Sequence, residues 1–180
     1  MSKIRRKTRE TDVTVDLRPG GGESNAQTTD AFLDHMLITL ARYAGLEIDV
    51  RASGDLPHHL IEDVAITVGA ALLDEIPAAC GRYGEATVPM DDAVVQVVLD
   101  AGGRSWYEGP LPDRHYDHFM RSLASAAATT LHVRVLRGND RHHVVEAAFK
   151  ALGLALREAL RQTDAVFSTK GAVQLERLED

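Results

Sequence analysis

The sequence predicts an α+β domain made of two similar halves, in which helices pack on mixed sheets. The main observation is a motif of two histidines and a glutamate that occurs twice, with the second copy 84 positions after the first. Each half also shows the same order of expected elements: strands, helix, strand, helix. A half of this size is too small to bury its apolar face alone, so we expect the two halves to pack as one domain. The repeated residues are His58, His59 and Glu62, followed by His142, His143 and Glu146.

A second pair of segments supports the duplication. Residues 34–41 match residues 117–124 at a spacing of 83 positions, with aspartate, histidine, leucine and alanine identical in place. The two copies of the histidine motif and the two copies of this segment are therefore separated by almost the same number of positions. We predict a single domain over residues 1–180, with pseudo-repeats at about 10–80 and 81–165 and a C-terminal tail that binds phosphate.

Two kinds of apolar pattern define the elements of the first half. Alternation of apolar and polar residues predicts strands, and apolar residues three or four positions apart predict helices. A glycine-rich polar stretch between the first strand and the first helix predicts a loop. Asp30 and Gly45 are residue types that begin and end a helix. In order, the strand, loop, helix, strand and helix cover residues 11–17, 19–29, 32–44, 46–52 and 58–76.

The second half has the same order with a longer run of strands. Valine-rich segments on either side of Asp91 and Asp92 predict two strands joined by a turn. Gly102 and Gly103 interrupt the pattern before a further short strand. The three strands, helix, strand and helix cover residues 85–90, 93–100, 105–109, 116–128, 131–136 and 142–161.

Composition and charge limit the classes of function. Of 180 residues, 44% are hydrophobic and 26% are charged, which is typical of a globular domain. The net charge of −7 argues against a nucleic-acid partner, because binding to nucleic acid needs a basic face. The basic residues near the start are expected to form a solvated terminus, with an RNA-binding arm as the alternative. They are Lys3, Arg5, Arg6, Lys7 and Arg9.

Membrane insertion and secretion are not expected. No apolar run is long enough to cross a bilayer, and nothing after the basic start resembles the apolar segment of a secretory signal. Cys80 is the single cysteine, which excludes an intramolecular disulfide. We therefore expect a reducing, cytoplasmic location.

The doubled histidine motif predicts two metal centres. Residues four apart on a helix project from the same face, so His58 can share a metal with Glu62, and His142 with Glu146. The adjacent histidines point about 100° further round the helix and would serve a different metal. A lone histidine on a helix is usually a packed or capping residue, and it is the duplication that favours metal ligation.

Two more histidines, at matching positions on the preceding helices, complete the predicted ligand sets. Three imidazole nitrogens and one carboxylate for each metal leave room for substrate or water at an octahedral ion, which suits Mn²⁺ better than closed tetrahedral zinc. His115 is expected at the surface, and His132 is expected to be structural or to support the ligands. The eight predicted ligands are His35, His58, His59, Glu62, His118, His142, His143 and Glu146.

Taken together, the motifs resemble the imidazoleglycerol-phosphate dehydratase family over nearly the whole chain. The family commonly has glutamine where Thr39 stands and histidine where Tyr43 stands, and none of the predicted metal ligands is missing. The resemblance is carried by the segments RET (9–11), FLDHML (32–37), HHLIED (58–63), RYG (82–84), VPMD (88–91), GR (103–104), LHVR (131–134), HHVVEAAFK (142–150) and STKG (168–171).

The resemblance implies a lyase of histidine biosynthesis that dehydrates imidazole glycerol phosphate to imidazole acetol phosphate with two Mn²⁺ per subunit. It places the metal ligands on the same eight residues. It implies catalytic roles for Glu10 as acid/base, for Asp91 in orienting the substrate, and for Glu62 and Glu146. A role in the turn between two strands is the alternative for Asp91. It assigns the phosphate to Arg82, Arg104, Lys150, Ser168 and Lys170.

The resemblance also implies assembly. Family members form homo-oligomers of 24 subunits in which neighbouring subunits complete the metal sites, so we expect a metal-dependent homo-oligomer with no nucleic-acid or membrane partner. Two alternatives use the same ligands: a dinuclear metal hydrolase, and a non-catalytic protein for metal storage or sensing. In the storage or sensing protein, the predicted acid/base Glu10 and the phosphate-binding Arg82, Arg104 and Lys170 could be replaced without loss of function.

Overall fold

The structure is a computed structural model that describes residues 1–168. The first half of this part comprises β1 (Ser2–Lys7), β2 (Thr11–Pro19), β3 (Asn25–Gln27), α1 (Ala31–Ala44), β4 (Leu46–Gly54) and α2 (Pro57–Glu75). The second half comprises β5 (Tyr83–Met90), β6 (Ala93–Asp100), β7 (Trp106–Glu108), α3 (Arg114–Ala126), β8 (Thr130–Arg137) and α4 (Arg141–Ala159).

The two halves have the same topology. The first sheet has the strand order β1-β2-β4-β3 and the second has β5-β6-β8-β7. In each sheet the three longer strands pair antiparallel, and the short edge strand, β3 or β7, pairs parallel with its neighbour. This confirms the prediction of a duplicated α+β fold with mixed sheets.

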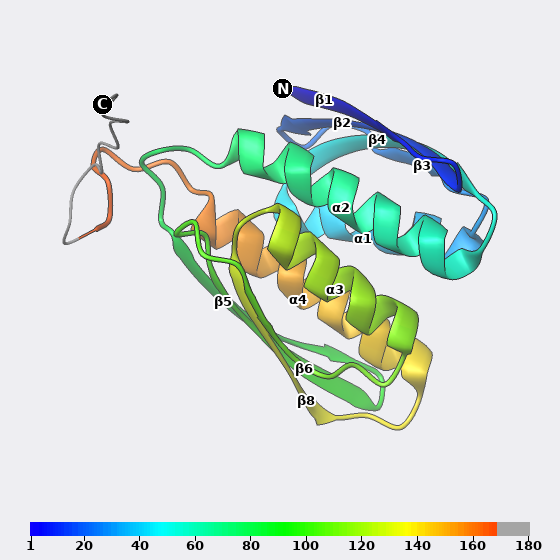
Figure 1. The fold of residues 1–180 in the computed structure, drawn as a ribbon. Helices are drawn as coiled ribbons and strands as arrows, with labels where there is room; N and C mark the ends of the chain where they lie inside the picture. The colour runs from blue at the N-terminus through cyan, green and yellow to red at the C-terminus, as the bar shows by residue number, and fades with distance from the viewer. Residues whose placement is uncertain (169–180) are drawn as a thin grey trace, which may run out of the picture.

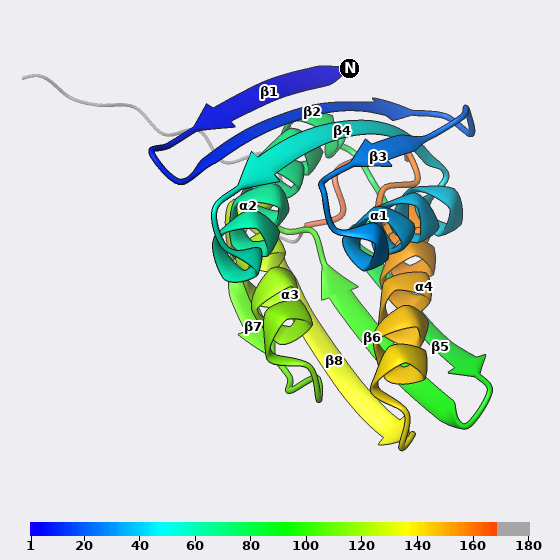
Figure 2. The same cartoon turned by 90° about the vertical axis from the view of Figure 1, so that its right-hand side faces the viewer.

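The helices lie between the sheets. Helices α1 and α2 pack on the first sheet, α3 and α4 pack on the second, and the two pairs pack against each other. The layers are therefore sheet, helices, helices, sheet (Figure 1, Figure 2). Contacts between the halves are made by α1 with α4 and by α2 with α3. This crossed pairing decides which side chains of one half meet those of the other.

The strands bury one face because their apolar residues alternate. Val13 and Val15 of β2, and Val95 and Val97 of β6, are fully buried against the helices. The residues between them point to the outer faces of the sheets, as the twofold period of a strand requires. His132 of β8 is one of these outward residues, since its neighbours Leu131 and Val133 are buried.

The predicted helix ends are confirmed for α1. The side chain of Asp30 accepts hydrogen bonds from the backbone N–H groups of Phe32 and Leu33, which satisfies donors that the helix itself cannot use. Gly45 ends the helix with φ of 70°, a left-handed conformation that favours glycine. Asp113, which stands 83 positions after Asp30, caps α3 in the same way.

Two glycines allow the helices of the two halves to approach closely. A Cβ atom on Gly69 of α2 would lie 2.8 Å from the Cβ of Ala126 on α3. A Cβ on Gly153 of α4 would lie 2.6 Å from the Cβ of Tyr43 on α1. Any side chain at either position would force the helices apart. These glycines have the same 84-residue spacing as the histidine motifs, so the two crossings are equivalent.

The structure contains two strands that the sequence pattern did not predict. The basic start of the chain was expected as a solvated terminus, but it is strand β1, paired antiparallel with β2. Its charged side chains Lys3, Arg5 and Lys7 are exposed, so it lacks the apolar alternation that marks a half-buried strand. Strand β3 lies inside the stretch predicted as a loop, and its three residues are too short to give a pattern.

No helix within residues 1–168 has the length and hydropathy that crossing a bilayer requires.

Candidate metal centres

The first candidate centre joins α2 and α3, which belong to different halves. Glu62 Oε2 lies 3.7 Å from Nε2 of His58, one turn earlier on α2. Glu62 Oε1 lies 3.2 Å from Nε2 of His118 on α3. One ligand atom from each of the three residues lies within 4.8 Å of the others. The glutamate thus links an imidazole of its own helix to one from the other half.

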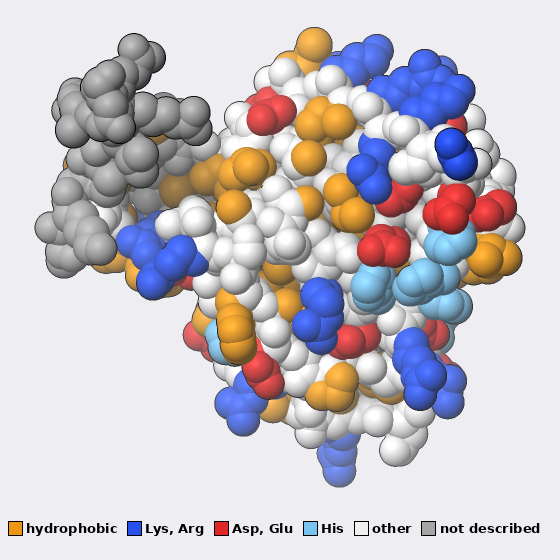
Figure 3. All heavy atoms as spheres, in the orientation of Figure 1, with side chains coloured by type: hydrophobic (Ala, Val, Ile, Leu, Met, Phe, Trp, Pro, Cys, Tyr) orange, Lys and Arg blue, Asp and Glu red, His pale blue; other side chains and the backbone are white. Residues whose placement is uncertain are grey.

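The second candidate centre joins α4 and α1 through Glu146, but within residues 1–168 its three ligand atoms do not form a group within 4.8 Å of one another as those of the first centre do. Glu146 Oε2 lies 3.3 Å from Nε2 of His142 on the same helix and 3.7 Å from Nε2 of His35 on α1. Six of the eight predicted ligands therefore form two sets of two imidazoles and one carboxylate. Histidines gather with acidic side chains on one face of the molecule in Figure 3.

The chemistry of these sets fits a divalent cation. Imidazole nitrogen and carboxylate oxygen are the ligands that zinc and manganese use, and adjacent ligands about 2.1 Å from an ion lie about 3 Å apart. Nε2 of His118 is buried and has no hydrogen-bond partner among residues 1–168. Its 3.2 Å distance to Glu62 is short enough for a hydrogen bond, but the geometry does not form one. A cation held by both groups would satisfy this nitrogen.

The remaining two predicted ligands lie outside these sets. Nδ1 of His59 is 2.8 Å from Oδ1 of Asp55 and 3.6 Å from Oε2 of Glu10. These three residues form a group of their own, with ligand atoms within 4.8 Å of one another. The predicted acid/base Glu10 therefore accompanies the second histidine of the motif and not the first.

His143 has an equivalent environment in the second half. Its Nδ1 is 2.7 Å from Oδ1 of Asp92, and its Nε2 is 3.3 Å from Oδ2 of Asp91. A carboxylate on Nδ1 fixes the orientation of an imidazole and leaves Nε2 as the ligand atom. Both second histidines are thus oriented by an aspartate. Each is also next to a residue with a predicted catalytic role, Glu10 or Asp91.

The carboxylates change the acidity of these histidines. The hydrogen bond with Asp55 raises the pKa of His59, and that with Asp92 raises the pKa of His143. The pKa of Asp92 is lowered to about 2, first by the backbone N–H of Asn139 and then by His143. In each case the largest cause is a hydrogen bond that favours the charged form, and partial burial opposes it.

Glu146 has an additional partner on its own helix. Lys150 Nζ lies 2.8 Å from Oε1 of Glu146, and both side chains are largely buried. Burial raises the pKa of Glu146, but the hydrogen bond and charge of Lys150 outweigh it, so the pKa of this carboxyl is lowered. Lys150, which the family resemblance assigns to phosphate, is therefore paired with a predicted metal ligand in this structure.

Part of the predicted phosphate set lines one cavity. A cavity of about 370 Å³ is lined by Arg82 and Ser168, together with Gly102, Gly103 and Phe167 among others. The guanidinium of Arg82 donates to both carboxylate oxygens of Asp100, at 2.8 and 3.1 Å, and to the carbonyl oxygen of Phe167 at 3.2 Å.

The other members of the phosphate set lie elsewhere. Arg104 follows the glycine pair of this cavity, and its charge helps to lower the pKa of Asp100, which the hydrogen bond from Arg82 lowers most. Lys150 lies with Glu146, as described above. Lys170 lies outside the described residues.

The sequence pattern did not predict two aromatic neighbours of His58 and His142, the first histidine of each motif. The ring of His115, expected simply at the surface, has its centroid 6.2 Å from that of His58. In the second centre the ring of Phe32 lies 4.8 Å from that of His142. Phe32 and His115 are 83 positions apart, as are His35 on α1 and His118 on α3. The repeat itself could therefore have revealed this pair.

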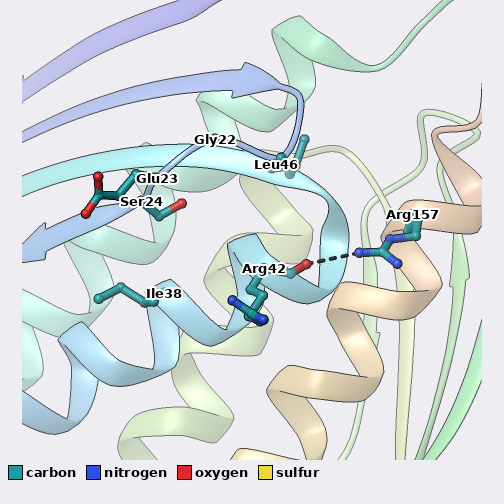
Figure 4. Close-up of a pocket in the computed structure, with 8 residues that line it drawn as sticks. Gly22, Glu23, Ser24, Ile38, Arg42, Leu46 and Arg157 are labelled. Atoms are coloured by element: carbon teal, nitrogen blue, oxygen red, sulfur yellow. Dashed lines mark hydrogen bonds between the residues drawn. The ribbon is translucent and has the colours of Figure 1, made fainter.

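A larger cavity, of about 530 Å³, contains none of the predicted site residues. Arg157 of α4 lies at its edge and donates to the carbonyl oxygen of Arg42, near the end of α1 (Figure 4). Arginine in the last turn of a helix compensates the negative end of the helix dipole. This contact therefore has a structural explanation. The cavity is lined by Gly21, Gly22, Glu23, Ser24, Ile38, Arg42, Leu46 and Arg157.

Known proteins of one kind resemble this chain. A family model described as imidazoleglycerol-phosphate dehydratase matches residues 28–156. A relative of that name from Pyrobaculum aerophilum is 46% identical, covering 93% of this chain and 97% of its own. One from Methanoculleus marisnigri is 42% identical, covering 96% and 98%.

Solved structures agree with the sequence relatives. The crystal structure of IGPD from Pyrococcus furiosus in complex with (S)-C348 matches with a TM-score of 0.85 and 40% identity, covering 94% of this chain and 100% of that chain. The imidazoleglycerol-phosphate dehydratase from Staphylococcus aureus matches with a TM-score of 0.80 and 30% identity, covering 91% and 100%.

Proposed function

Because the chain belongs to the imidazoleglycerol-phosphate dehydratase family of histidine biosynthesis, we propose that it dehydrates imidazole glycerol phosphate to imidazole acetol phosphate at two divalent-metal centres. The observation that carries the metal dependence is the approach of His118 to Glu62. Residues from different halves of the chain meet there with ligand atoms 3.2 Å apart, and the buried imidazole nitrogen has no hydrogen bond within the part of the chain that the structure describes.

Within one chain, each centre would be held by two imidazoles and one glutamate. His58, Glu62 and His118 would hold one cation, and the equivalent residues of α4 and α1 would hold the other. When bound, the cations would stabilise negative charge that develops on the imidazole ring of the substrate. Mn²⁺ at two ions per chain is our proposal, because mixed imidazole and carboxylate ligands with open positions suit this ion.

Proton transfer would be carried out by the chain itself. Dehydration removes a proton from one carbon and a hydroxyl group from the next, so the proton of the first carbon must be accepted and a proton must be delivered to the departing hydroxyl, which leaves as water. We assign this exchange to the carboxylate of Glu10, with the proton at Oε2. Asp91 would orient the substrate from the equivalent position beside His143. The exposure of Glu10 allows it to exchange its proton with water.

The phosphate of the substrate would be bound by cations and small polar groups near the C-terminal tail. Arg82 and Ser168 line a common cavity, which supports this assignment. Arginine offers two parallel N–H donors to a phosphate, and glycine-rich backbone permits close approach of an anion. The proposed set is Arg82, Arg104, Lys150, Ser168 and Lys170, in which Lys150 would reach the phosphate from its position beside Glu146 at the second centre.

We further propose that the active form is a cytoplasmic homo-oligomer of 24 subunits. His59 and His143 lie outside the two candidate metal centres of their own chain, although they stand on the same helices as His58 and His142. Each would supply its Nε2 to a centre of a neighbouring subunit, bringing Glu10 or Asp91 with it. The single Cys80 is consistent with a reducing compartment.

A direct assay tests this proposal. The purified protein is freed of metal, reloaded with Mn²⁺ and mixed with imidazole glycerol phosphate, and the formation of imidazole acetol phosphate is measured. We expect turnover that requires Mn²⁺ and is lost in Glu10→Gln. Hydrolysis of phosphate esters without dehydration would favour the hydrolase alternative. Bound Mn²⁺ without turnover of either substrate would favour storage or sensing.

A further inference from the structure

The carboxylate of the first centre directs both of its oxygens at imidazoles. Oε2 of Glu62 faces His58 at 3.7 Å, and Oε1 faces His118 at 3.2 Å. Both oxygens are therefore positioned toward the space between the two rings. A carboxylate in this orientation can bind one cation through both oxygens, as bidentate glutamates do.

The carboxylate of the second centre has only one oxygen in this role. Both imidazoles, His142 and His35, lie nearest to Oε2 of Glu146, at 3.3 and 3.7 Å. The other oxygen, Oε1, is bound to the ammonium group of Lys150 at 2.8 Å. One face of this carboxylate is thus already used by a positive charge from the same chain.

The repeat shows that this difference is built into the sequence. Lys150 stands 84 positions after Ile66, and Glu146 stands 84 positions after Glu62. The residue one turn after the glutamate is therefore an uncharged isoleucine in the first centre and a lysine in the second. The lysine side chain is only 16% exposed, and its Nζ lies 5.9 Å from the ring centroid of Tyr43, so water screens its charge weakly.

The rings that lie beside the two centres also favour a cation at the first centre. The imidazole of His115 lies beside His58 in the first centre, whereas the apolar ring of Phe32 lies beside His142 in the second. A polar ring tolerates a cation and its water ligands better than a phenyl ring does. Two independent features therefore make the first centre the more favourable one for a cation.

On the premise of the proposed metal-dependent function, we propose that the two centres are unequal and that Lys150 is the positioning residue that makes them so. The centre of His58, Glu62 and His118 binds a divalent cation more tightly than the centre of His35, Glu146 and His142. The reason is that Lys150 holds one oxygen of Glu146 and repels a second positive charge. The first centre is filled at low metal concentration, and the second is filled only as the concentration rises.

The test is a titration of the metal-free full-length protein with Mn²⁺, followed by the electron paramagnetic resonance signal of the free ion. We expect two classes of site whose Kd values differ at least about tenfold. Glu62→Gln should remove the tight class, and Glu146→Gln should remove the weak class. These assignments do not depend on turnover.

A reciprocal pair of variants tests the role of Lys150. Lys150→Met should tighten the weak class toward the Kd of the tight class, and Ile66→Lys should weaken the tight class by a similar factor. Arg134→Met is the matched control, since it removes one positive charge from an exposed position on β8 and should leave both Kd values unchanged.

The possible results separate the two proposals. Equal Kd values for the two sites in a protein that turns over its substrate would overturn the inequality and leave the proposed function intact. Unequal sites that neither Lys150→Met nor Ile66→Lys alters would overturn the role of Lys150 and would also leave the proposed function intact. A protein that binds no Mn²⁺ under any condition would overturn the metal-dependent function, and the inequality with it.

Discussion

Nε2 of His118, carried by the second half of the chain, lies 3.2 Å from Oε1 of Glu62, carried by the first half. The same exchange occurs in reverse, where His35 of the first half approaches Glu146 of the second at 3.7 Å. Neither half therefore contains a complete centre of its own. The duplication produces two sites only because the helices of the halves are interleaved.

His118 and His35 each approach a glutamate of the other half, and loss of either should remove one cation and spare the other. In His118→Ala the first centre keeps one imidazole and one carboxylate of its own chain, so the metal bound after dialysis against enough Mn²⁺ to fill both centres of the unmodified protein should fall from two ions per chain to one. His35→Ala should have the same effect at the other centre. Metal content is measured by atomic emission on the dialysed protein. His132→Ala, on the outer face of the second sheet, is the matched control and should retain both ions.

The close helix crossing predicts that Gly69 tolerates no side chain. In Gly69→Val the new Cβ meets Ala126 Cβ and the carbonyl oxygen of Leu123 at 2.8 Å, and a backbone atom cannot move aside cheaply. The free energy of unfolding should fall by about 2 kcal/mol or more, lowering Tm by about 4 °C or more. Thermal unfolding of the metal-free protein measures this. Gly21→Val meets nothing within 4 Å and should leave Tm nearly unchanged; an equal loss in both variants would contradict the packing argument.

The pair of His143 and Asp92 should stabilise the metal-free protein most in mildly acidic solution. The raised pKa of His143 contributes stability below pH 6.5, which is lost as the pH rises through the folded value. The pKa of Asp92, lowered to about 2, contributes stability above pH 3.8, which is lost as the pH falls toward 2. Both contributions are present between these limits.

The pKa values of His143 and His59 are measured by following the imidazole protons of the metal-free protein by NMR. Asp92→Asn should lower the pKa of His143 toward its ordinary value. Asp55→Asn should do the same for His59. If the pKa of His143 stays raised in Asp92→Asn, the carboxylate is not its cause.

Removal of a predicted phosphate ligand should weaken substrate binding. Arg104→Met deletes a charged donor, and such hydrogen bonds contribute about 1.5–3 kcal/mol, so KM should rise about tenfold to a hundredfold with a smaller change in kcat. Steady-state kinetics with imidazole glycerol phosphate separate the two constants. Arg134→Met, which removes the same charge from the outer face of β8, should leave KM unchanged. A loss confined to kcat would show that Arg104 does not bind the substrate in its ground state.

Chelation should dissociate the assembly. If His59 and His143 complete centres in neighbouring subunits, the binding energy of the metal contributes to association. Light scattering should show a large particle with Mn²⁺ and a smaller species after treatment with EDTA. His59→Ala should weaken assembly even with the metal present. A monomer of the same size with and without chelator would contradict this model.

Local patterns predicted much of the fold. The helices near residues 32–44 and 58–76 were found because their apolar spacing and end residues are encoded within a few positions. Strands β1 and β3 were missed for the opposite reason. The exposed basic residues of β1 carry no alternation, and the three residues of β3 become a strand only because β4 offers a partner. Pairing of this kind depends on chain segments that are distant in sequence.

The candidate site shows the same division. The pairing of His58 with Glu62 follows from helix geometry, because residues four apart lie on one face. The partner of His59 was also within reach of the sequence, since Asp55 precedes it by four positions. The partner of His143, Asp92, is 51 residues away and joins it only through the turn between β5 and β6. No spacing rule connects residues that are so far apart.

The sequence by itself determined the duplication, the ligand types and the family resemblance, since these are written in residue identity and in spacings of 83 and 84 positions. The tertiary structure decided which half supplies which histidine to which glutamate. It also decided that Lys150 contacts Glu146 instead of lying with Arg82. The physical reason is that these contacts follow from how α1 packs on α4 and α2 on α3. That packing is set by the burial of both sheets at once, through the close approaches at Gly69 and Gly153.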